Sequence, residues 1–506
     1  MFFLTCALHR SVEAVCAIPF EGSGRSCGKR CGSFGFLRPS RSSAAAAPQS
    51  HYDLMIIERI QGARSYLTSG GLGPFLVRSV AGTGAIKIFS MIASFLVGVQ
   101  LARGLGVKGY GYYGIALSIV TLAGVPAELG LPPLVTREVA AAEARGILGH
   151  LFGVLGWARR IATRLSAVMA FLVIVAALVL SQLHPSPLVF ALLAGAPIIP
   201  FMALAKVNCG ALRGLRQIVR AQIASTLWRP AAMALLLLLM VHVVGIKLQP
   251  WKAVGLNAIT AGGAWMIAAI WLSRRLPHRG EIEPIKEGRQ WISSMIPLAL
   301  TQAIQTLQGQ LSILLIGLLA SAAQVGLFRI AMTTAVMLSA PQGIIITVTL
   351  PLISRLHAQH DRKRLQTLVT RSAQAQFAAV LLLSVPLFVA PEWVLTLVYG
   401  KAYAAAADVL RIILVGQLIT IGFGLNGSVL NMTHHERRVT RAVAVALVLN
   451  AATFAILVPE WGIIGAAVGF VVSMLAWNVL TWLDARRLVG VDTSFLPLPV
   501  SPPKAG

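Results

Sequence analysis

Charged residues are scarce in this sequence. They make up 12% of the chain, about half their share in a soluble globular domain, while 57% of the residues are hydrophobic. A soluble fold of this size needs a charged surface, so most of the surface of this protein must face lipid rather than water. The composition therefore excludes a soluble enzyme and predicts a membrane protein.

Acidic residues are scarcer still, with 17 Asp and Glu against 43 Lys and Arg. Such an excess of positive charge is common in proteins that bind nucleic acid. Here, however, the basic residues lie in short loops between apolar runs and no nucleic-acid motif accompanies them, which is how the cytoplasmic loops of membrane proteins look. We therefore expect no nucleic acid among the partners.

Cysteine is rare as well, with five residues in the whole chain. Cys27 and Cys31 are close in sequence but have no other metal-ligating residues beside them. The pattern predicts neither a disulfide framework nor a metal site, and we expect no cofactor.

The first 54 residues contain no apolar run of spanning length and are rich in Ser, Ala, Gly and Arg, a composition typical of disorder. Two interpretations stay open: a flexible cytoplasmic tail, or a chain whose translation begins at Met55. The whole chain then divides into a disordered or pre-membrane segment, a six-helix lobe, a cytoplasmic linker, a second six-helix lobe and a cytoplasmic tail, at residues 1–70, 71–272, 273–291, 292–490 and 491–506.

Apolar stretches of about the 20 residues that a membrane-spanning helix needs recur from residue 80 onward. Backbone in lipid must satisfy its own hydrogen bonds, so these stretches predict helices rather than strands. The expected fold is an all-α, polytopic membrane protein with about twelve spans, at residues 80–101, 112–131, 161–183, 187–207, 222–244, 253–272, 292–319, 326–350, 369–390, 409–431, 439–458 and 463–483.

The loops set the expected orientation. If the N-terminus is inside, the outward loops hold only Arg103, Lys108, Lys247, Lys252 and Lys401. Each inward loop then holds three or more basic residues, including Arg145, Arg213, Arg274, Lys363 and Arg437. Lys and Arg mark cytoplasmic loops, so we expect both termini in the cytoplasm and the chain in the cell (inner) membrane.

An internal repeat links the two halves. Gly111–Leu117 resembles Gly326–Met332, and two further pairs of similar segments follow in the same order, after the second and eighth spans and before the fifth and eleventh. The offset of six spans gives both halves the same orientation. This predicts two six-helix lobes related by an axis along the membrane normal, with a binding site between them.

These segments resemble the polysaccharide flippase family, the lipid-linked oligosaccharide translocases of the multidrug/oligosaccharidyl-lipid/polysaccharide exporter superfamily. The resemblance covers roughly residues 75–490, and the segments that carry it are Leu101–Tyr113 with Leu129–Glu138, Gln324–Arg329 with Leu350–Arg355, Leu397–Tyr403 with Val409–Ile413, and Trp461–Ala467.

What the resemblance implies is a two-lobed carrier with a cationic central cavity. Its substrate is then a polyprenyl-diphosphate-linked glycan, flipped from the cytoplasmic to the outer leaflet by alternating access. Membrane lipids, a polysaccharide polymerase and glycosyltransferases are the other partners that it suggests. It implies a transporter and not an enzyme.

Ionisable residues inside spans are the first candidates for the site. Lys87 lies seven residues into the first expected span and Arg329 near the start of the eighth, and in relatives basic residues on these helices meet the diphosphate. The alternative is that each side chain extends along its helix to the nearer membrane face.

Polar residues give two further candidates. Gln302 and Gln305 lie on one face of the seventh span, and Asn426 lies in the tenth. Lipid does not tolerate such a polar face, so these side chains point at protein or water. Contact with sugar and hydrogen bonding between helices are equally good interpretations of all three.

Glu128 is the only acidic residue well inside an expected span. A carboxylate there suits coupling of transport to ions. Pairing with Arg137 at the end of the same span is the preferred interpretation.

Three other functions remain open. A drug or cation exporter and a peptidoglycan-precursor flippase belong to the same superfamily, although cation exporters usually need intramembrane carboxylates, in which this chain is poor. A polyprenyl-linked glycosyltransferase, polymerase or ligase belongs to a different class. Such enzymes need paired acidic residues or a large outer loop, whereas the longest outer loop here, at about 391–408, carries only Glu392 and Asp408.

The charge asymmetry makes the topology testable. A single cysteine introduced at Val107 or Ala404 should react with a membrane-impermeant maleimide in intact cells, because both positions lie in expected outward loops. A cysteine at Leu215 or Gln359 should react only after permeabilisation, and labelling of this second pair from outside would contradict the orientation.

Overall fold

The computed structural model describes residues 72–128, 130–183, 186–243, 245, 247–276 and 288–498. Within these ranges the regular structure is entirely helical, which confirms the all-α fold. Nine helices in the described part are long and apolar enough to cross a membrane, so the chain is a multi-pass membrane protein. The expected tail at residues 1–70, with Met55, lies outside the described residues.

The first described helix contains a reversal. α3 (Leu72–Glu128) has 57 residues, roughly 85 Å at 1.5 Å per residue, far more than 30 Å of hydrocarbon requires. Its break is at Gly106, whose φ of 67° and ψ of 174° are open to glycine but strained for other residues. The expected span at 80–101 lies in the part of α3 before this glycine, and the expected span at 112–131 begins in the part after it and runs past the end of α3 at Glu128.

The same device recurs near the other end of the chain. α18 (Glu436–Asp484) is broken at Gly462, where φ is 55° and ψ is −131°, and it contains the expected spans at 439–458 and 463–483. The total of twelve spans stays a prediction.

The remaining elements fall into an N-terminal half (residues 72–276) and a C-terminal half (residues 288–498). After α3 the N-terminal half contains α4 (Leu131–Arg145), α5 (Leu148–Leu183), α6 (Pro187–Gly195), α7 (Ile198–Gly214), α8 (Ile218–Gln222), the π-helical turn η1 (Ile223–Leu227), α9 (Trp228–Leu238), the π-helical turn η2 (Leu239–Val243) and α10 (Pro250–Ser273). Within this half, α7 packs against α3, α4, α5 and α10.

The C-terminal half contains α11 (Gly288–Leu319), α12 (Ala322–Met337), α13 (Ala340–Ala358), α14 (Arg362–Val389), α15 (Pro391–Tyr399), the 3-10 turn η3 (Lys401–Ala406), α16 (Ala407–Gly422), α17 (Asn426–Met432), α18 and the π-helical turn η4 (Ala485–Val489). Within this half, α16 and α18 pack together, and α14 lies against α16.

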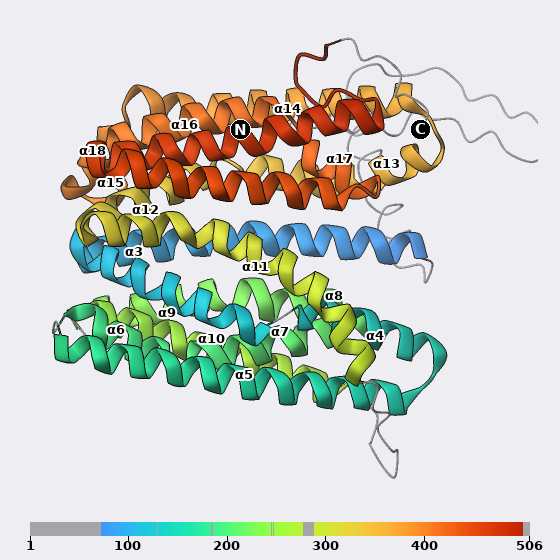
Figure 1. Cartoon of the computed structure of the whole chain (residues 1–506), viewed down its shortest axis with the longest axis horizontal. Coiled ribbons are helices and arrows are strands. Elements are labelled where there is room, and N and C mark those ends of the chain that lie inside the picture. Colours follow the sequence, from blue (N-terminus) through green and yellow to red (C-terminus); the bar gives the residue numbers. More distant parts are fainter. Residues whose placement is uncertain are drawn as a thin grey trace, which may run out of the picture. The chain divides into compact units, whose positions relative to one another are not determined.

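Helix α11 joins the two halves by packing against both. At its start, the rings of Trp157 on α5 and Trp291 on α11 lie 5.3 Å apart. Toward its end, the Ser312 hydroxyl donates to Asn450 on α18 at 3.4 Å. α11 therefore runs from α4 and α5 past α3 to the C-terminal half (Figure 1).

Helices α3 and α12 lie side by side (Figure 1). At two glycines their backbones are in contact. A Cβ added at Gly111 would overlap the carbonyl oxygen of Ala322, and one added at Gly326 would overlap the carbonyl oxygen of Val107. Only glycine permits helices to approach so closely. We refer to these four residues as the α3–α12 contact.

The α3–α12 contact is reciprocal. Val107 and Ala322 have the same sequence separation as Gly111 and Gly326, so each half offers the same carbonyl and the same glycine to the other. Reciprocity of this kind is what a two-fold axis produces. Gly111 and Gly326 are the first residues of the first pair of similar segments in the internal repeat. The two segments of this pair therefore begin at the contact between the two halves.

The residues after η4 pack against the helices, although the sequence led us to expect a tail from 491 onward. Asp492 is fully buried, and its carboxylate accepts hydrogen bonds from Trp482 at 2.9 Å and from the Leu498 amide at 3.0 Å. Burial alone would raise the pKa of Asp492, but these bonds and those from Ser494 outweigh it and hold the pKa below its usual range. Sequence reasoning missed this because the polar anchor is a single Asp.

The α3–α12 contact gives a test of the fold. Gly111→Ala and Gly326→Ala should each lower the free energy of unfolding of the purified protein by roughly 1–3 kcal/mol, because the overlap forces the helices apart. Gly124→Ala, also on α3, is the matched control, because a Cβ added there meets nothing within 4 Å. Equal effects of all three substitutions would show that α3 and α12 do not touch.

Candidate functional site

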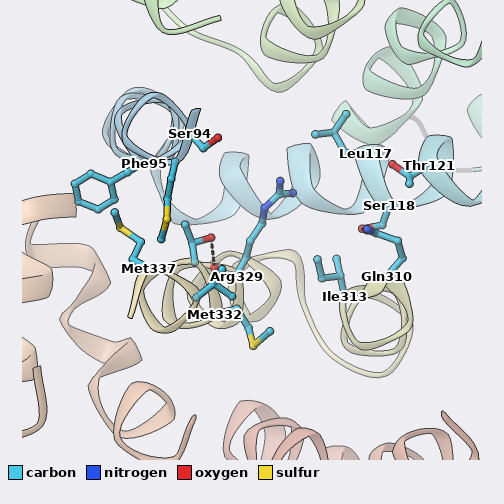
Figure 2. Close-up of a pocket in the computed structure, with 13 residues that line it drawn as sticks. Ser94, Phe95, Leu117, Ser118, Thr121, Gln310, Ile313, Arg329, Met332 and Met337 are labelled. Carbon is cyan, nitrogen blue, oxygen red and sulfur yellow. Dashed lines mark hydrogen bonds between the residues drawn. The ribbon is translucent and has the colours of Figure 1, made fainter. Parts of the chain in front are cut away.

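A cavity of about 370 Å³ lies between α3, α11 and α12. Figure 2 shows its lining: Ser94 and Phe95 from the first part of α3, Leu117, Ser118 and Thr121 from the second part, Gln310 and Ile313 from α11, and Arg329, Met332 and Met337 from α12. We call it the central cavity. Arg329 is its only charged lining residue among those that the structure describes.

Arg329 reaches from α12 toward α3 (Figure 2). Its guanidinium carbon lies 5.2 Å from the ring centre of Tyr110 and 5.0 Å from that of Tyr113, so both rings offer it cation–π contacts. No carboxylate in the described part of the chain is within ion-pair distance of it. The guanidinium is thus a half-buried cation held by aromatic faces, at the edge of a cavity.

Lys87 lies on the same side of α3 as the central cavity, one helical turn before the lining residue Met91. Its side chain is exposed, and a Cβ added at Gly343 on α13 would lie 3.5 Å from its Nζ. Lys87 therefore faces α13.

The structure does not bring Lys87 and Arg329 together. Gly98 on α3 packs against Thr333 on α12, which sets the register of the two helices. Lys87 lies eleven residues from Gly98 along α3. Arg329 lies four residues from Thr333 along α12, in the opposite direction. At 1.5 Å per residue the two cations are separated by roughly 20 Å along the helices. The two cations therefore lie at different levels of the helices rather than side by side.

A second cavity, of about 680 Å³, lies among α3, α4, α7, η1, α9, α10 and α11. We call it the basic cavity because four cations and a single carboxylate line it: Arg137, Lys206, Arg213, Arg229 and Glu128. Gln302 of α11 also lines this cavity, with its side chain exposed.

Glu128 pairs with Lys206, at 2.5 Å between Oε1 and Nζ, so the expected pairing with Arg137 is wrong. Gly130, with φ of 69°, turns the chain between α3 and α4, and Glu128 and Arg137 line the same cavity without pairing. Arg137 pairs with Glu138 instead, at 2.8 Å on the surface. α7, which packs against both α3 and α4, brings Lys206 to the carboxylate.

Arg229 is a cation of the basic cavity that sequence reasoning passed over, although it lies inside the expected span at 222–244. It follows the π-helical turn η1, a distortion that often marks functional sites. Its Nη2 donates to Asn257 at 2.6 Å, while its buried Nε has no hydrogen-bond partner. The signal in the sequence was a single Arg before Pro230 at the head of an apolar run.

A polar chain connects the two cavities. Arg229 donates to Asn257, and Asn257 donates to the hydroxyl of Tyr113 at 3.2 Å. The ring of Tyr113 in turn makes a cation–π contact with the guanidinium of Arg329. The cation of the central cavity is thereby connected to the basic cavity through three side chains.

The other polar candidates are divided between cavity and packing. Gln302 lines the basic cavity, while Gln310, two turns further along α11, accepts a hydrogen bond from Ser118 at 2.8 Å. The side chain of Gln305 lies outside the described residues. Asn426 is buried and donates to Asn478 of α18 at 3.0 and 3.1 Å, which favours hydrogen bonding between helices for this residue.

A family model described as polysaccharide biosynthesis protein matches residues 76–357, more than half of the chain. The chain belongs to this family. Both cavities are built mainly from the matched region. A second family model, MatE, matches residues 297–456, so the polysaccharide biosynthesis protein match and the MatE match overlap on α11, α12 and α13. No curated protein matches the chain.

Solved structures of several transporters share the fold of this protein. A multidrug resistance transporter of the MATE family, in an inward-facing conformation, has a TM-score of 0.65 at 13% identity and covers 81% of this chain and 98% of its own. The lipid II flippase MurJ, in an inward closed conformation, has a TM-score of 0.59 at 13% identity, covering 80% and 87%. A transporter of the MOP superfamily from Pyrococcus furiosus has a TM-score of 0.58 at 13% identity, and the match covers 84% of this chain and 97% of that protein.

The ion pair in the basic cavity can be tested by stability. Lys206→Ala should lower the free energy of unfolding by roughly 1–3 kcal/mol, because it leaves the mostly buried Glu128 carboxylate unpaired. The double variant Glu128→Gln, Lys206→Met should recover most of that loss, since it removes both charges. Arg137→Ala, in an exposed pair, should change little. Thermal unfolding of the purified protein measures all three, and an Arg137 effect as large as that of Lys206 would contradict the assignment.

Proposed function

We propose that this protein flips a polyprenyl-diphosphate-linked oligosaccharide, the repeat unit of a polysaccharide, from the cytoplasmic to the outer leaflet by alternating access. The observation that carries the proposal is the charge of the two cavities in a member of the polysaccharide biosynthesis protein family. The described residues that line the two cavities include five cations and a single carboxylate, and that carboxylate is already paired. Such cavities suit an anionic substrate.

Elementary energetics explain why such a substrate needs a protein. A diphosphate with an attached oligosaccharide does not cross hydrocarbon unaided, because removing it from water costs too much free energy. Cations and amides inside the helical body replace that water. An inside-negative membrane potential also favours outward movement of the anionic group, by about 2.3 kcal/mol per charge per 100 mV.

The two cavities follow one another along α11. Gln302 in the basic cavity and Gln310 in the central cavity are eight residues apart, or roughly 12 Å. We assign the basic cavity to first contact with the anionic head group and Arg329 to the diphosphate in the central cavity. We assign Lys87 to contact with the substrate at a different stage and Gln302 to contact with the sugar. Gln305 stays a sugar contact predicted from the sequence.

Export of drugs or cations by ion coupling is the second candidate, and the MatE match favours it. It requires a carboxylate that is free to bind a cation or a proton. Glu128 is the one carboxylate that lines either cavity in the described part of the chain, and it is bound to Lys206. A role of Glu128 in ion coupling would therefore require this pair to open during transport.

The proposed setting is the cell membrane, with both termini in the cytoplasm. In this orientation the basic cavity lies nearer the cytoplasm and the α3–α12 contact on the outer side. Membrane lipids, glycosyltransferases that build the substrate and a polymerase that consumes it are the partners that the proposal implies.

The test is to remove the cations one at a time. A lone cation at the centre of a bilayer costs roughly 2.5–3.5 kcal/mol on insertion scales, so a carrier that keeps one gains something by it. We expect Arg329→Ala and Lys87→Ala to lower flipping at least tenfold without lowering membrane abundance, and Lys87→Arg to retain part of the activity.

The measurement is the appearance of the lipid-linked sugar in the outer leaflet, normalised to the amount of protein. Lys401→Ala is the matched control, because Lys401 is exposed and lies outside both cavities. Normal flipping by both alanine variants would remove these residues from the site, since side chains that only extend to the membrane face can be replaced without harm.

A further inference from the structure

Contacts between the two halves gather around the break in α3. The α3–α12 contact is one of them. Arg103, just before Gly106, donates to the carbonyls of Leu397 at 2.6 Å and Val398 at 2.8 Å at the end of α15. Tyr403 of η3 donates to the carbonyl of Ala102 at 2.9 Å. The proposed topology places all of these contacts on the outer side of the central cavity, and we refer to them together as the outer closure.

Arg329 belongs both to this closure and to the central cavity. It lies three residues after Gly326 on α12, and the rings that hold it, Tyr110 and Tyr113, are on α3 beside Gly111. A Cβ added at Gly114 would lie 2.7 Å from its Nη1, so the guanidinium packs directly on the backbone of α3. The same group lines the central cavity.

The tyrosine side of this arrangement is anchored. The hydroxyl of Tyr113 accepts a hydrogen bond from Asn257 on α10, and Asn257 accepts one from Arg229. Tyr110 is buried at 2% exposure. Arg329 has no comparable anchor: in the described part of the chain, no hydrogen bond or ion pair fixes its guanidinium. If the two sides separate, Arg329 is the group that moves.

We propose that Arg329 couples occupancy of the central cavity to the α3–α12 contact. When the cavity is empty, the cation–π contacts with Tyr110 and Tyr113 hold α12 against α3. A diphosphate in the cavity offers the guanidinium charge-assisted, bidentate hydrogen bonds, which are stronger than contact with an aromatic face. The anion therefore draws Arg329 off the rings and favours separation of the contact.

This proposal rests on the proposed function for the identity of the anion. Its consequence is that an empty carrier stays closed on the outer side, because only the loaded state releases Arg329. A ligand shifts such an equilibrium only by its difference in affinity for the two states. In this proposal Arg329 supplies that difference, because it exchanges the tyrosine rings for the anion.

The experiment measures the contact directly. Cysteines at Val107 and Ala322, in a chain whose five native cysteines are replaced by alanine, are crosslinked with a short bismaleimide. The rate is followed by mass spectrometry in proteoliposomes. Without ligand, Arg329→Ala should slow crosslinking about tenfold, within the usual range of coupling between sites, and Arg329→Lys should restore only part of the rate, because an ammonium does not stack as a guanidinium does.

One matched pair and one control variant separate the cation–π contact from general packing. Tyr110→Leu should slow crosslinking as Arg329→Ala does, whereas Tyr110→Phe, which keeps the aromatic face, should not. Lys401→Ala should leave the rate unchanged. If Arg329→Ala crosslinks as fast as the parent, or if Tyr110→Phe is as slow as Tyr110→Leu, the cation–π contact does not hold the helices and the proposal is wrong.

The ligand arm uses inorganic pyrophosphate, with sodium sulfate at equal ionic strength as the comparison. Pyrophosphate should slow crosslinking of the parent about fivefold or more and leave the Arg329→Ala rate unchanged. No effect on the parent would overturn the coupling. Flipping of the lipid-linked sugar is measured separately, so a protein that responds to pyrophosphate through Arg329 but does not flip would refute the proposed function and leave the coupling standing.

Discussion

Hydrocarbon cannot solvate charge, and this constraint governs the polar interior of the protein. Each cation in the helical body must find a partner there or serve a ligand. Lys206 is neutralised by Glu128, whereas Arg229 is only partly satisfied by Asn257 and Arg329 rests on two tyrosine rings. Lys206 lines the basic cavity but is neutralised there, whereas Arg229 and Arg329 line cavities with their charge incompletely paired. This is why we connect these two cations with an anionic substrate.

The glycines make this arrangement possible. Gly106 lets α3 return on itself, and Gly111 and Gly326 let α12 lie against the returning part with its backbone in contact. The side chain of Arg329, less than one turn beyond Gly326, is thereby brought within reach of Tyr110 and Tyr113. Electrostatics at the cavity and packing at the closed end are thus properties of the same few helical turns.

Most of the fold could be predicted from the sequence, because lipid leaves only helices as a solution and apolar length identifies them. The two parts of α3 and of α18 follow the expected spans, with the breaks at Gly106 and Gly462. The site was less accessible. Arg329 stood out as a cation beside an apolar run, but Arg229 carried the same signal and was passed over.

What could not be predicted depends on how helices distant in sequence pack together. Glu128 has Arg137 nearby in sequence, yet its partner is Lys206, because the packing of α7 and not chain proximity decides which charge arrives. In the same way, the wide separation of Lys87 and Arg329 follows from the register of α3 against α12, which no single segment encodes.

Transport by the purified protein in proteoliposomes tests most directly whether the cavities bind an anionic, lipid-linked sugar and the protein moves it across the membrane. A fluorescent polyprenyl-diphosphate-linked oligosaccharide is supplied in one leaflet and a lipophilic organic cation in a parallel sample. We predict that the protein moves the lipid-linked sugar between leaflets, faster when a membrane potential drives the anion, and leaves the cation where it was. Expulsion of the cation without movement of the sugar would contradict the account.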